Sequence, residues 1–143
     1  MIAEFKDEYE FLSNFYPSPF TVDGIYYPTV EHYFQAMKTL NIGKRKEIAV
    51  ASTPGRAKRL GRTVELRPDW EEVKIDVMRN GLAYKFAHHP DLRQKLITTK
   101  GKTLIEGNFW HDNTWGDCYC ENCKDTKGKN LLGRSLMALR DLF

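Results

Sequence analysis

The sequence has no long hydrophobic run. None of its apolar stretches reaches the roughly 18 residues that a membrane-spanning helix requires. Its first residues include Glu4, Lys6 and Asp7, where a secretory leader would have a basic stretch followed by an apolar one. These absences predict a soluble protein, located in the cytoplasm, without a membrane partner.

Internal repeats, low-complexity segments and a strong charge of one sign are also missing. The 143 residues are 41% hydrophobic, and a chain of about this length can bury a hydrophobic core without disulfides or a structural metal. The formal net charge is only +3, which is much less positive than is typical of a protein that binds duplex nucleic acid tightly. The composition predicts one globular domain over residues 1–143, with a charge that allows phosphate-bearing ligands.

The local patterns predict a mainly helical α+β domain with a short β-hairpin. Two short runs, Phe20–Val22 and Ile25–Tyr27, flank the two-residue turn Asp23-Gly24, which is a hairpin signal. A short strand is expected at 2–5, and helices are expected at about 29–40, 43–51, 54–61, 69–88, 91–98 and 130–143. Gly61 is expected to end the third helix as a left-handed cap, and Asp69 to cap the start of the fourth. This order is not a parallel βαβ series.

The helix that begins after Thr29 carries the most informative residues. Thr29 can cap the helix, Glu31 falls in its first turn, and Gln35 lies four residues later on the same face. The neighbours Tyr33 and Phe34 are aromatic. One interpretation is an ordinary acid at the positive end of a helix dipole, worth about 0.3–1 kcal/mol. The other is that a polar pair in apolar surroundings forms the floor of a pocket.

The irregular segment 106–117 is the second unusual feature. It combines Trp110 and Trp115 with acids that include Asp112 and Asp117. Aromatic rings and carboxylates on a loop suit a ligand that resembles a nucleobase or a sugar. The alternative is that the tryptophans fill the core while the acids make hydrogen bonds within turns.

Three cysteines and a histidine follow closely in sequence. Cys118, Cys120 and Cys123 lie within six residues, and His111 lies seven residues upstream of the first. Three thiolates and one imidazole would complete a tetrahedral zinc site, although the spacing is not a standard pair of Cys-x-x-Cys motifs. Reduced thiols without metal are the alternative. We expect no cofactor and no catalytic metal, and a structural zinc remains the open option.

Four segments resemble the NADAR family, which includes the riboflavin-intermediate N-glycosidases. In chain order they are FLSNFY at 11–16, YPTVEHYFQA at 27–36, WGD at 115–117 and GKNLLG at 128–133. The resemblance runs from about residue 4 to the C-terminus and implies a mainly helical α+β fold. It also implies hydrolysis of the bond between C1′ of a ribose and the nitrogen of a base-like amine.

The resemblance places the chemistry on two acids. Cleavage of a C1′–N bond develops positive charge on the ribose, so one carboxylate stabilises that charge and one activates water. Glu31 matches the glutamate of the family motif and is the first candidate catalytic residue. Asp112, three residues before the WGD motif, is the second. Asp117 within that motif either orients ribose hydroxyls or acts as a structural cap.

Other matched residues are expected to bind the substrate. Asn14 and Phe15 would contact the edge and the face of the base, and Gln35 would lie beside Glu31. Trp70 matches a family tryptophan linked to substrate binding, with core packing as its alternative, and Trp115 belongs to the aromatic loop described above.

Phosphate binding needs cations or free backbone donors. Arg62 and Arg67 are the candidates within the basic run that begins at Arg56, because guanidinium groups bind phosphate bidentately; the alternative is a solvated face. Asn130 opens the last helix after two lysines, and helix N-termini attract phosphate. The alternative there is ordinary capping.

The sequence therefore predicts an N-glycosidase, a hydrolase. The resemblance implies two substrate groups, which are ribosylamino-pyrimidine phosphates of riboflavin biosynthesis and ADP-ribose linked to guanine or nucleic acid. An ADP-ribosylated nucleic acid would be held weakly. The alternative is a non-catalytic module that binds ADP-ribose or an NAD-type nucleotide. The enzyme is favoured because Glu31, which a binder would not need, stands in its family setting.

Overall fold

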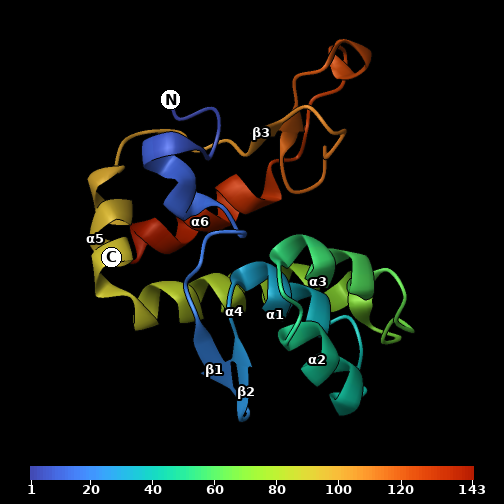
Figure 1. The fold of residues 1–143 in the computed structure, drawn as a ribbon. Coiled ribbons are helices and arrows are strands. Elements are labelled where there is room, and N and C mark those ends of the chain that lie inside the picture. The colour runs from blue at the N-terminus through green and yellow to red at the C-terminus, as the bar shows by residue number, and fades with distance from the viewer. The chain divides into compact units, whose positions relative to one another are not determined.

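A computed structural model describes all residues, 1–143. The chain forms two compact units (Figure 1), one made of Asn14–Pro90 and the other of Met1–Ser13 together with Asp91–Phe143. No helix in the structure has the length and apolar character needed to cross a membrane. Both units are mainly helical with one small sheet each, which confirms the predicted fold class. The single domain expected from composition stays a prediction.

The unit Asn14–Pro90 begins with the hairpin of β1 (Phe20–Val22) and β2 (Ile25–Tyr27). The strands are antiparallel, with Phe20 opposite Tyr27. The turn residues Asp23 and Gly24 have φ angles of 51° and 78°. Positive φ at both turn positions matches the right-handed twist of the strands, so the predicted hairpin is confirmed.

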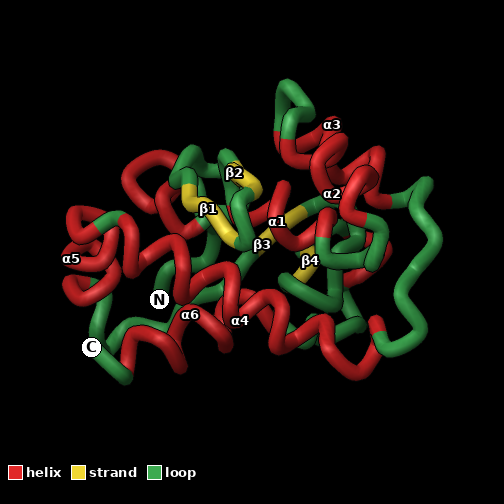
Figure 2. The backbone as a smooth tube through the Cα atoms, turned by 90° about the horizontal axis from the view of Figure 1, so that it is seen from below, coloured by secondary structure: helices red, strands yellow, loops and turns green.

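Four helices complete this unit: α1 (Val30–Ala36), α2 (Ile42–Ala49), α3 (Pro54–Gly61) and α4 (Trp70–His88). Helix α1 packs against α2, α3 and α4 (Figure 2). All seven of its residues are buried. A helix that is buried on every side is the centre of its unit.

The starts of α1, α2 and α3 follow the capping rules. The side-chain oxygens of Thr29, Asn41 and Thr53 each accept a hydrogen bond from a backbone N–H of the first turn, which satisfies one of the free donors there. Asp69 precedes α4 but makes no such bond. Asp69 thus occupies the expected N-cap position of α4, but its side chain does not cap the helix, because its carboxylate is bound by Arg67.

Gly61 is the second correction. Its φ is not positive, and it is the last residue of α3, not a left-handed residue beyond it. A Cβ at this position would overlap the side chain of Gln35 on α1. Glycine is needed here because α3 approaches α1 closely, so a tertiary contact explains a residue that local rules assigned to a cap.

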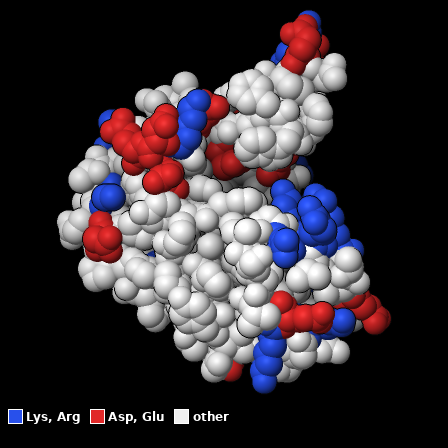
Figure 3. Space-filling model, in the orientation of Figure 1, with Lys and Arg blue, Asp and Glu red and all other residues white.

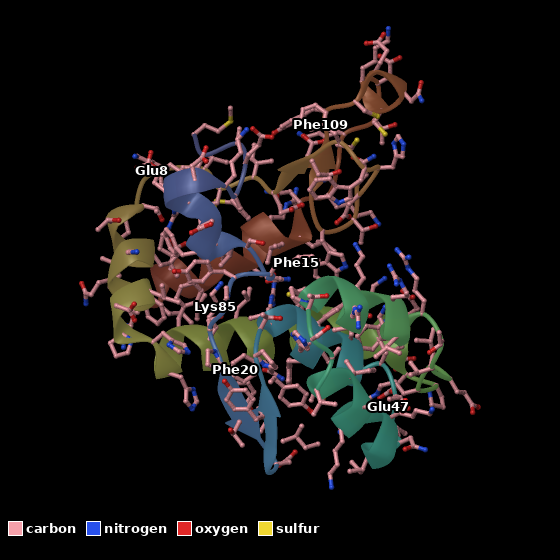
Figure 4. The ribbon with its side chains drawn as sticks, viewed as in Figure 1. Glu8, Phe15, Phe20, Glu47, Lys85 and Phe109 are labelled. Atoms are coloured by element: carbon pink, nitrogen blue, oxygen red, sulfur yellow. The ribbon has the colours of Figure 1, made fainter.

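Aromatic rings fill the space between the hairpin, α1 and α4. The ring of Phe20 (Figure 4) lies 5.5 Å from the rings of Tyr33 and Tyr84, and Tyr27 meets Tyr33 edge-on at 5.4 Å. Burial raises the pKa of Tyr33 to about 12. The two edge-to-face pairs and the stacked Phe20–Tyr84 pair add about 0.5–1.5 kcal/mol each beyond area burial, and they fix the hairpin against the two helices.

Lys85 on α4 is fully buried. Its ammonium lies 5.3 Å from the ring centre of Phe86 and 5.8 Å from that of Tyr16, and Figure 4 labels its position. Burial lowers the pKa of Lys85 to about 7, since desolvation disfavours the charged form.

The unit formed by the two ends of the chain contains two longer helices, α5 (Pro90–Thr98) and α6 (Leu131–Asp141). Its short elements are the 3₁₀ helices Asp7–Leu12 and Glu121–Cys123 and the strands β3 (Gly107–Asn108) and β4 (Asp117–Cys118). The strands pair in parallel, with Gly107 beside Asp117. The strand expected at 2–5 is reduced to a single bridge between Ile2 and Leu104.

Arg140 ties α6 to the end of α5. It is 6% exposed, and its Nη1 donates to the carbonyl oxygens of Thr99 and Lys102, both at 2.8 Å. These carbonyls follow the last turn of α5, where acceptors lack helical partners. The buried guanidinium of Arg140 therefore supplies the hydrogen-bond donors for these carbonyl oxygens.

His32, next to Glu31 on α1, is 1% exposed. Its Nε2 lies 2.9 Å from the carbonyl oxygen of Ala51 and its Nδ1 lies 2.8 Å from Oγ1 of Thr29. A carbonyl only accepts, so Nε2 carries the proton and Nδ1 accepts from the threonine hydroxyl. Burial lowers the pKa of His32 from 6.5, opposed by the bond to Ala51. The side chain is thus built in as a neutral imidazole.

This arrangement predicts acid-sensitive stability. The unfolded chain binds a proton at position 32 more readily than the folded chain, so the free energy of unfolding falls as pH drops below about 6.5. His32→Gln removes the titrating group, and we expect a flatter pH dependence in urea unfolding between about pH 5 and 8. His88→Gln, at an exposed histidine, is the control and should follow the wild type. Parallel curves for wild type and His32→Gln would contradict this assignment.

Candidate active site

Glu31 lies in the first turn of α1 and is 8% exposed. Nε2 of Gln35 donates a hydrogen bond to Oε1 of Glu31 at 2.8 Å. The pair expected from the four-residue spacing is therefore formed. Its members are held on one face of a buried helix, where the carboxylate orientation is fixed before any ligand arrives.

Asn14 lies beside this pair. The backbone carbonyl oxygen of Asn14 accepts a hydrogen bond from the backbone N–H of Glu31 at 3.1 Å. Its side-chain nitrogen lies 3.3 Å from Sδ of Met78, a weak acceptor. The structure thus brings together three residues that the sequence placed in the site, Asn14, Glu31 and Gln35.

Two acceptors in this group have no hydrogen-bond partner. Oδ1 of Asn14 and Oε1 of Gln35 are both buried and unpaired. An unmade hydrogen bond of this kind costs about 1–3 kcal/mol, and native proteins keep few of them. Two oxygens without a donor thus lie in the same group as the buried carboxylate of Glu31.

Positive charge lies close to the carboxylate. Burial lowers the pKa of the Lys38 ammonium, the charge of Glu31 raises it, and Arg62 and Lys58 lower it further. Lys38 was missed in the sequence, although it stands seven residues after Glu31, about two helical turns. Figure 3 shows lysine and arginine side chains gathered over α3, which carries Lys58 and ends next to Arg62.

The two arginines expected to bind phosphate differ. Nε and Nη2 of Arg67 donate to the two carboxylate oxygens of Asp69 at 2.6 and 3.1 Å, and the bond to Asp69 raises the pKa of the guanidinium. Its planar fork is already occupied. Arg62 is exposed at the end of α3, so the structure favours Arg62 over Arg67 as a phosphate ligand.

The two aromatic candidates of this unit also differ. Trp70 is 6% exposed, and its ring meets Phe34 edge-on at 5.1 Å. This packing favours the core alternative for Trp70, and its stacking on a base stays a prediction. Phe15 follows Asn14 and is 45% exposed (Figure 4). Its ring is the accessible aromatic surface next to the buried polar group.

The remaining candidates belong to the other unit. Oδ1 of Asp112 accepts hydrogen bonds from the backbone N–H groups of Thr114 and Trp115 at 3.1 and 2.9 Å. Oδ1 of Asp117 accepts from the N–H of Gly128 at 2.9 Å. Both acids thus shape the loop, as the turn alternative proposed, and a catalytic part for Asp112 stays a prediction. Trp115 is half-buried.

The start of α6 does not offer free donors to an anion. The N–H groups of Leu131 and Leu132 donate to the carbonyl oxygens of Thr114 and Trp115. The side chain of Asn130 donates to the carbonyl of Leu104 and accepts from the N–H of Glu106. The phosphate site expected around Asn130 is not supported, because the loop before β4 occupies these donors. The side chain of Asn130 connects the start of α6 to the segment 104–106.

Glycines in the WGD and GKNLLG motifs serve this close packing. A Cβ on Gly116 would overlap the carbonyl oxygen of Glu106, and one on Gly128 would overlap that of Gly116. Gly133 lies equally close to the carbonyl of Leu104. Trp110, in contrast, is 62% exposed, so the alternative that it fills the core is wrong.

Two further features lie outside these groups. His111 and the three cysteines form a cluster that could hold a metal. A cavity of about 330 Å³ also opens between the hairpin and α2. It is lined by Val22, Asp23, Gly24, Ile25, Tyr27, Met37, Ile42, Arg45 and Lys46. None of the predicted site residues lines this cavity, and no sequence motif marked it.

Comparison with known families shows what this chain is similar to. The model of the NADAR domain matches residues 2–143. The chain belongs to the NADAR family. N-glycosidase YbiA of Escherichia coli is 44% identical over 95% of this chain and 82% of its own length. The NMR structure of E. coli YbiA matches with a TM-score of 0.84 and 43% identity, covering 99% of this chain and 82% of that one.

A plant relative is similar over a part of its length. The riboflavin biosynthesis protein PYRR of Zea mays, a chloroplastic protein, is 38% identical over 90% of this chain, which covers 22% of that protein. These findings confirm the predicted family and the predicted enzyme class. The chain is an N-glycosidase of the NADAR family, and the non-catalytic alternative is set aside.

The unpaired acceptor of Asn14 generates a prediction that separates function from stability. Asn14→Leu replaces a buried oxygen without a partner by apolar atoms, so we expect the free energy of unfolding to stay equal or rise by about 1 kcal/mol. Glycosidase activity should fall strongly in the same variant. Chemical unfolding and turnover are the two measurements. A large loss of stability would show that the amide serves the fold.

Proposed function

We propose that this enzyme hydrolyses the C1′–N bond of a ribosylamino-pyrimidine phosphate, with Glu31 as the carboxylate that acts on the reacting ribose. The observation that carries the proposal is the buried Glu31–Gln35 pair with two unpaired acceptors beside it. The similarity to the riboflavin biosynthesis protein of Zea mays supports this substrate class.

The chemistry suits the environment of Glu31. As the C1′–N bond breaks, positive charge develops on the ribose, and a carboxylate fixed in advance stabilises that charge without reorganising. Gln35 donates a hydrogen bond to Oε1 of Glu31, which orients the carboxylate that we propose acts at C1′ or on the attacking water. The electron pair of the broken bond goes to the amine nitrogen, which takes a proton, and water supplies the new C1′ hydroxyl.

The unpaired acceptors complete the recognition. Oδ1 of Asn14 and Oε1 of Gln35 would accept hydrogen bonds from ribose hydroxyls or from amino groups of the pyrimidine. The exposed ring of Phe15 would contact the face of the base, because stacking on an aromatic side chain tolerates any flat heterocycle. We retain Asp112 as the proposed second acid.

Glu31→Gln is the decisive variant. The amide keeps the size of the side chain and can still accept from Gln35, so the fold should persist while turnover falls by about 10²–10⁴-fold. Mass spectrometry would follow products from a ribosylamino-pyrimidine phosphate and from guanine-linked ADP-ribose. Glu47→Gln, an exposed glutamate on α2 (Figure 4), is the matched control and should retain wild-type turnover.

The two substrates separate the outcomes. Release of ribose 5-phosphate by the wild type but not by Glu31→Gln would support the proposal. Release of ADP-ribose alone, by the wild type but not by Glu31→Gln, would keep Glu31 as the catalytic carboxylate. It would change the substrate class to ADP-ribose linked to guanine. Equal turnover by wild type and Glu31→Gln would refute the assignment of the catalytic carboxylate.

The arginine pair gives a second test. Arg62→Gln removes an exposed cation whose charge acts on Lys38. We expect KM for the phosphorylated substrate to rise about 10–100-fold with kcat little changed, because the loss of a charge-assisted hydrogen bond has about this effect. Arg67→Gln should lower stability and leave KM nearly unchanged, because Arg67 is bound to Asp69. The opposite pattern would place the phosphate at Arg67.

A further inference from the structure

Four potential metal ligands meet around β4. One ligand atom from each of His111, Cys118, Cys120 and Cys123 lies within 4.8 Å of the other three. Nδ1 of His111 is 3.3 Å from Sγ of Cys120, 3.3 Å from Sγ of Cys123 and 4.0 Å from Sγ of Cys118. All three cysteines are free thiols. One imidazole thus faces three sulfurs at nearly equal range.

These distances fit the edges of a zinc tetrahedron. Zinc binds sulfur at about 2.3 Å and nitrogen at about 2.0–2.1 Å, so nitrogen and sulfur ligands around one ion are about 3.5 Å apart. The observed separations of 3.3, 3.3 and 4.0 Å scatter about this value. The ligand atoms are already near the positions that a bound ion would require.

Backbone groups support the thiolate of Cys118. The N–H groups of His111 and Cys120 point to its Sγ at 3.3 and 3.5 Å. Its own N–H donates to Oδ1 of Asn113 at 2.9 Å, which fixes the backbone that carries it. Hydrogen bonds of this kind orient metal ligands and stabilise their charge.

The segment around the cluster is held by hydrogen bonds within its loop and has few regular elements. Its regular elements are the two-residue strands β3 and β4 and the three-residue helix Glu121–Cys123. Phe109, Trp110 and Tyr119 are exposed by 59%, 62% and 40%, so these large side chains do not form a buried core. Segments that cannot build a core are commonly stabilised by a metal or by disulfides, and no disulfide is formed here.

We propose that this chain binds one structural Zn²⁺ through Nδ1 of His111 and the thiolates of Cys118, Cys120 and Cys123. Soft thiolate ligands select zinc over the hard cations magnesium and calcium. The four protein ligands fill a tetrahedral shell and leave no position for water, so the ion stabilises structure and does not take part in hydrolysis.

The metal would fix the loop that carries two predicted site residues. His111 directly precedes Asp112, and Cys118 directly follows Asp117. His111 also has a φ of 69°, a left-handed conformation that a non-glycine residue rarely adopts. Ligation through its side chain would offset that strain and hold both ends of the segment 112–117.

Metal content tests the proposal on the full chain. The protein would be expressed with zinc, purified under reducing conditions without chelators or a metal-affinity column, and analysed by plasma mass spectrometry. We expect about one zinc per chain in the wild type, as a complete four-ligand site implies. Cys120→Ser and Cys123→Ser should lose most of it. His111→Asn removes the imidazole but keeps a residue that tolerates positive φ, and it should lose zinc as well.

Two further measurements keep the test decisive if a variant fails to fold. Replacement of zinc by Co²⁺ in the wild type should give the visible bands of a tetrahedral thiolate complex, and a thiol reagent should release zinc as three thiols react. His88→Asn, which changes an exposed histidine outside the cluster, should keep its zinc. Wild-type protein without zinc, with three free thiols or with a Cys120–Cys123 disulfide, would overturn the proposal.

Discussion

The complete burial of α1 is the constraint on which the unit Asn14–Pro90 depends. Every residue of this short helix is buried, including four with polar groups that can pair or titrate, Glu31, His32, Tyr33 and Gln35. Each has to be satisfied by its surroundings, since an unpaired polar group in the interior costs free energy. His32 meets this demand through Thr29 and Ala51, and Glu31 accepts a hydrogen bond from Gln35. The oxygen on this helix that stays unpaired is Oε1 of Gln35, and it belongs to the pair that carries the proposed chemistry.

The same demand explains why family motifs in the other unit are not all catalytic. The carbonyl oxygens of Thr114 and Trp115 accept the first N–H groups of α6, and the amide of Asn130 ties the segment 104–106. A motif residue can therefore be fixed by backbone satisfaction and close glycine packing alone. Buried oxygens without a partner distinguish Asn14 and Gln35 from Asn130, whose side-chain amide is hydrogen-bonded through both of its polar atoms.

Features fixed by neighbouring residues could be predicted from the sequence. The Asp23-Gly24 turn needs two positive φ angles, and Thr29 caps the helix that follows it; both depend on a few adjacent residues. Features set by distant segments could not. Gly61 makes room for Gln35, and the pairing of β3 with β4 joins residues ten apart in a loop. The cysteine spacing predicted possible ligands, but only the fold shows that His111 faces all three.

The burial of Glu31 has an energetic consequence for glycoside cleavage. Coulomb attraction between a carboxylate and a developing cation strengthens as the effective dielectric constant falls, by about fourfold from bulk water to an effective value near 20. A carboxylate that is 8% exposed and held by Gln35 has exchanged its water for fixed dipoles before the substrate binds. A helix buried for packing thereby also supplies the low-dielectric setting in which one carboxylate is most effective.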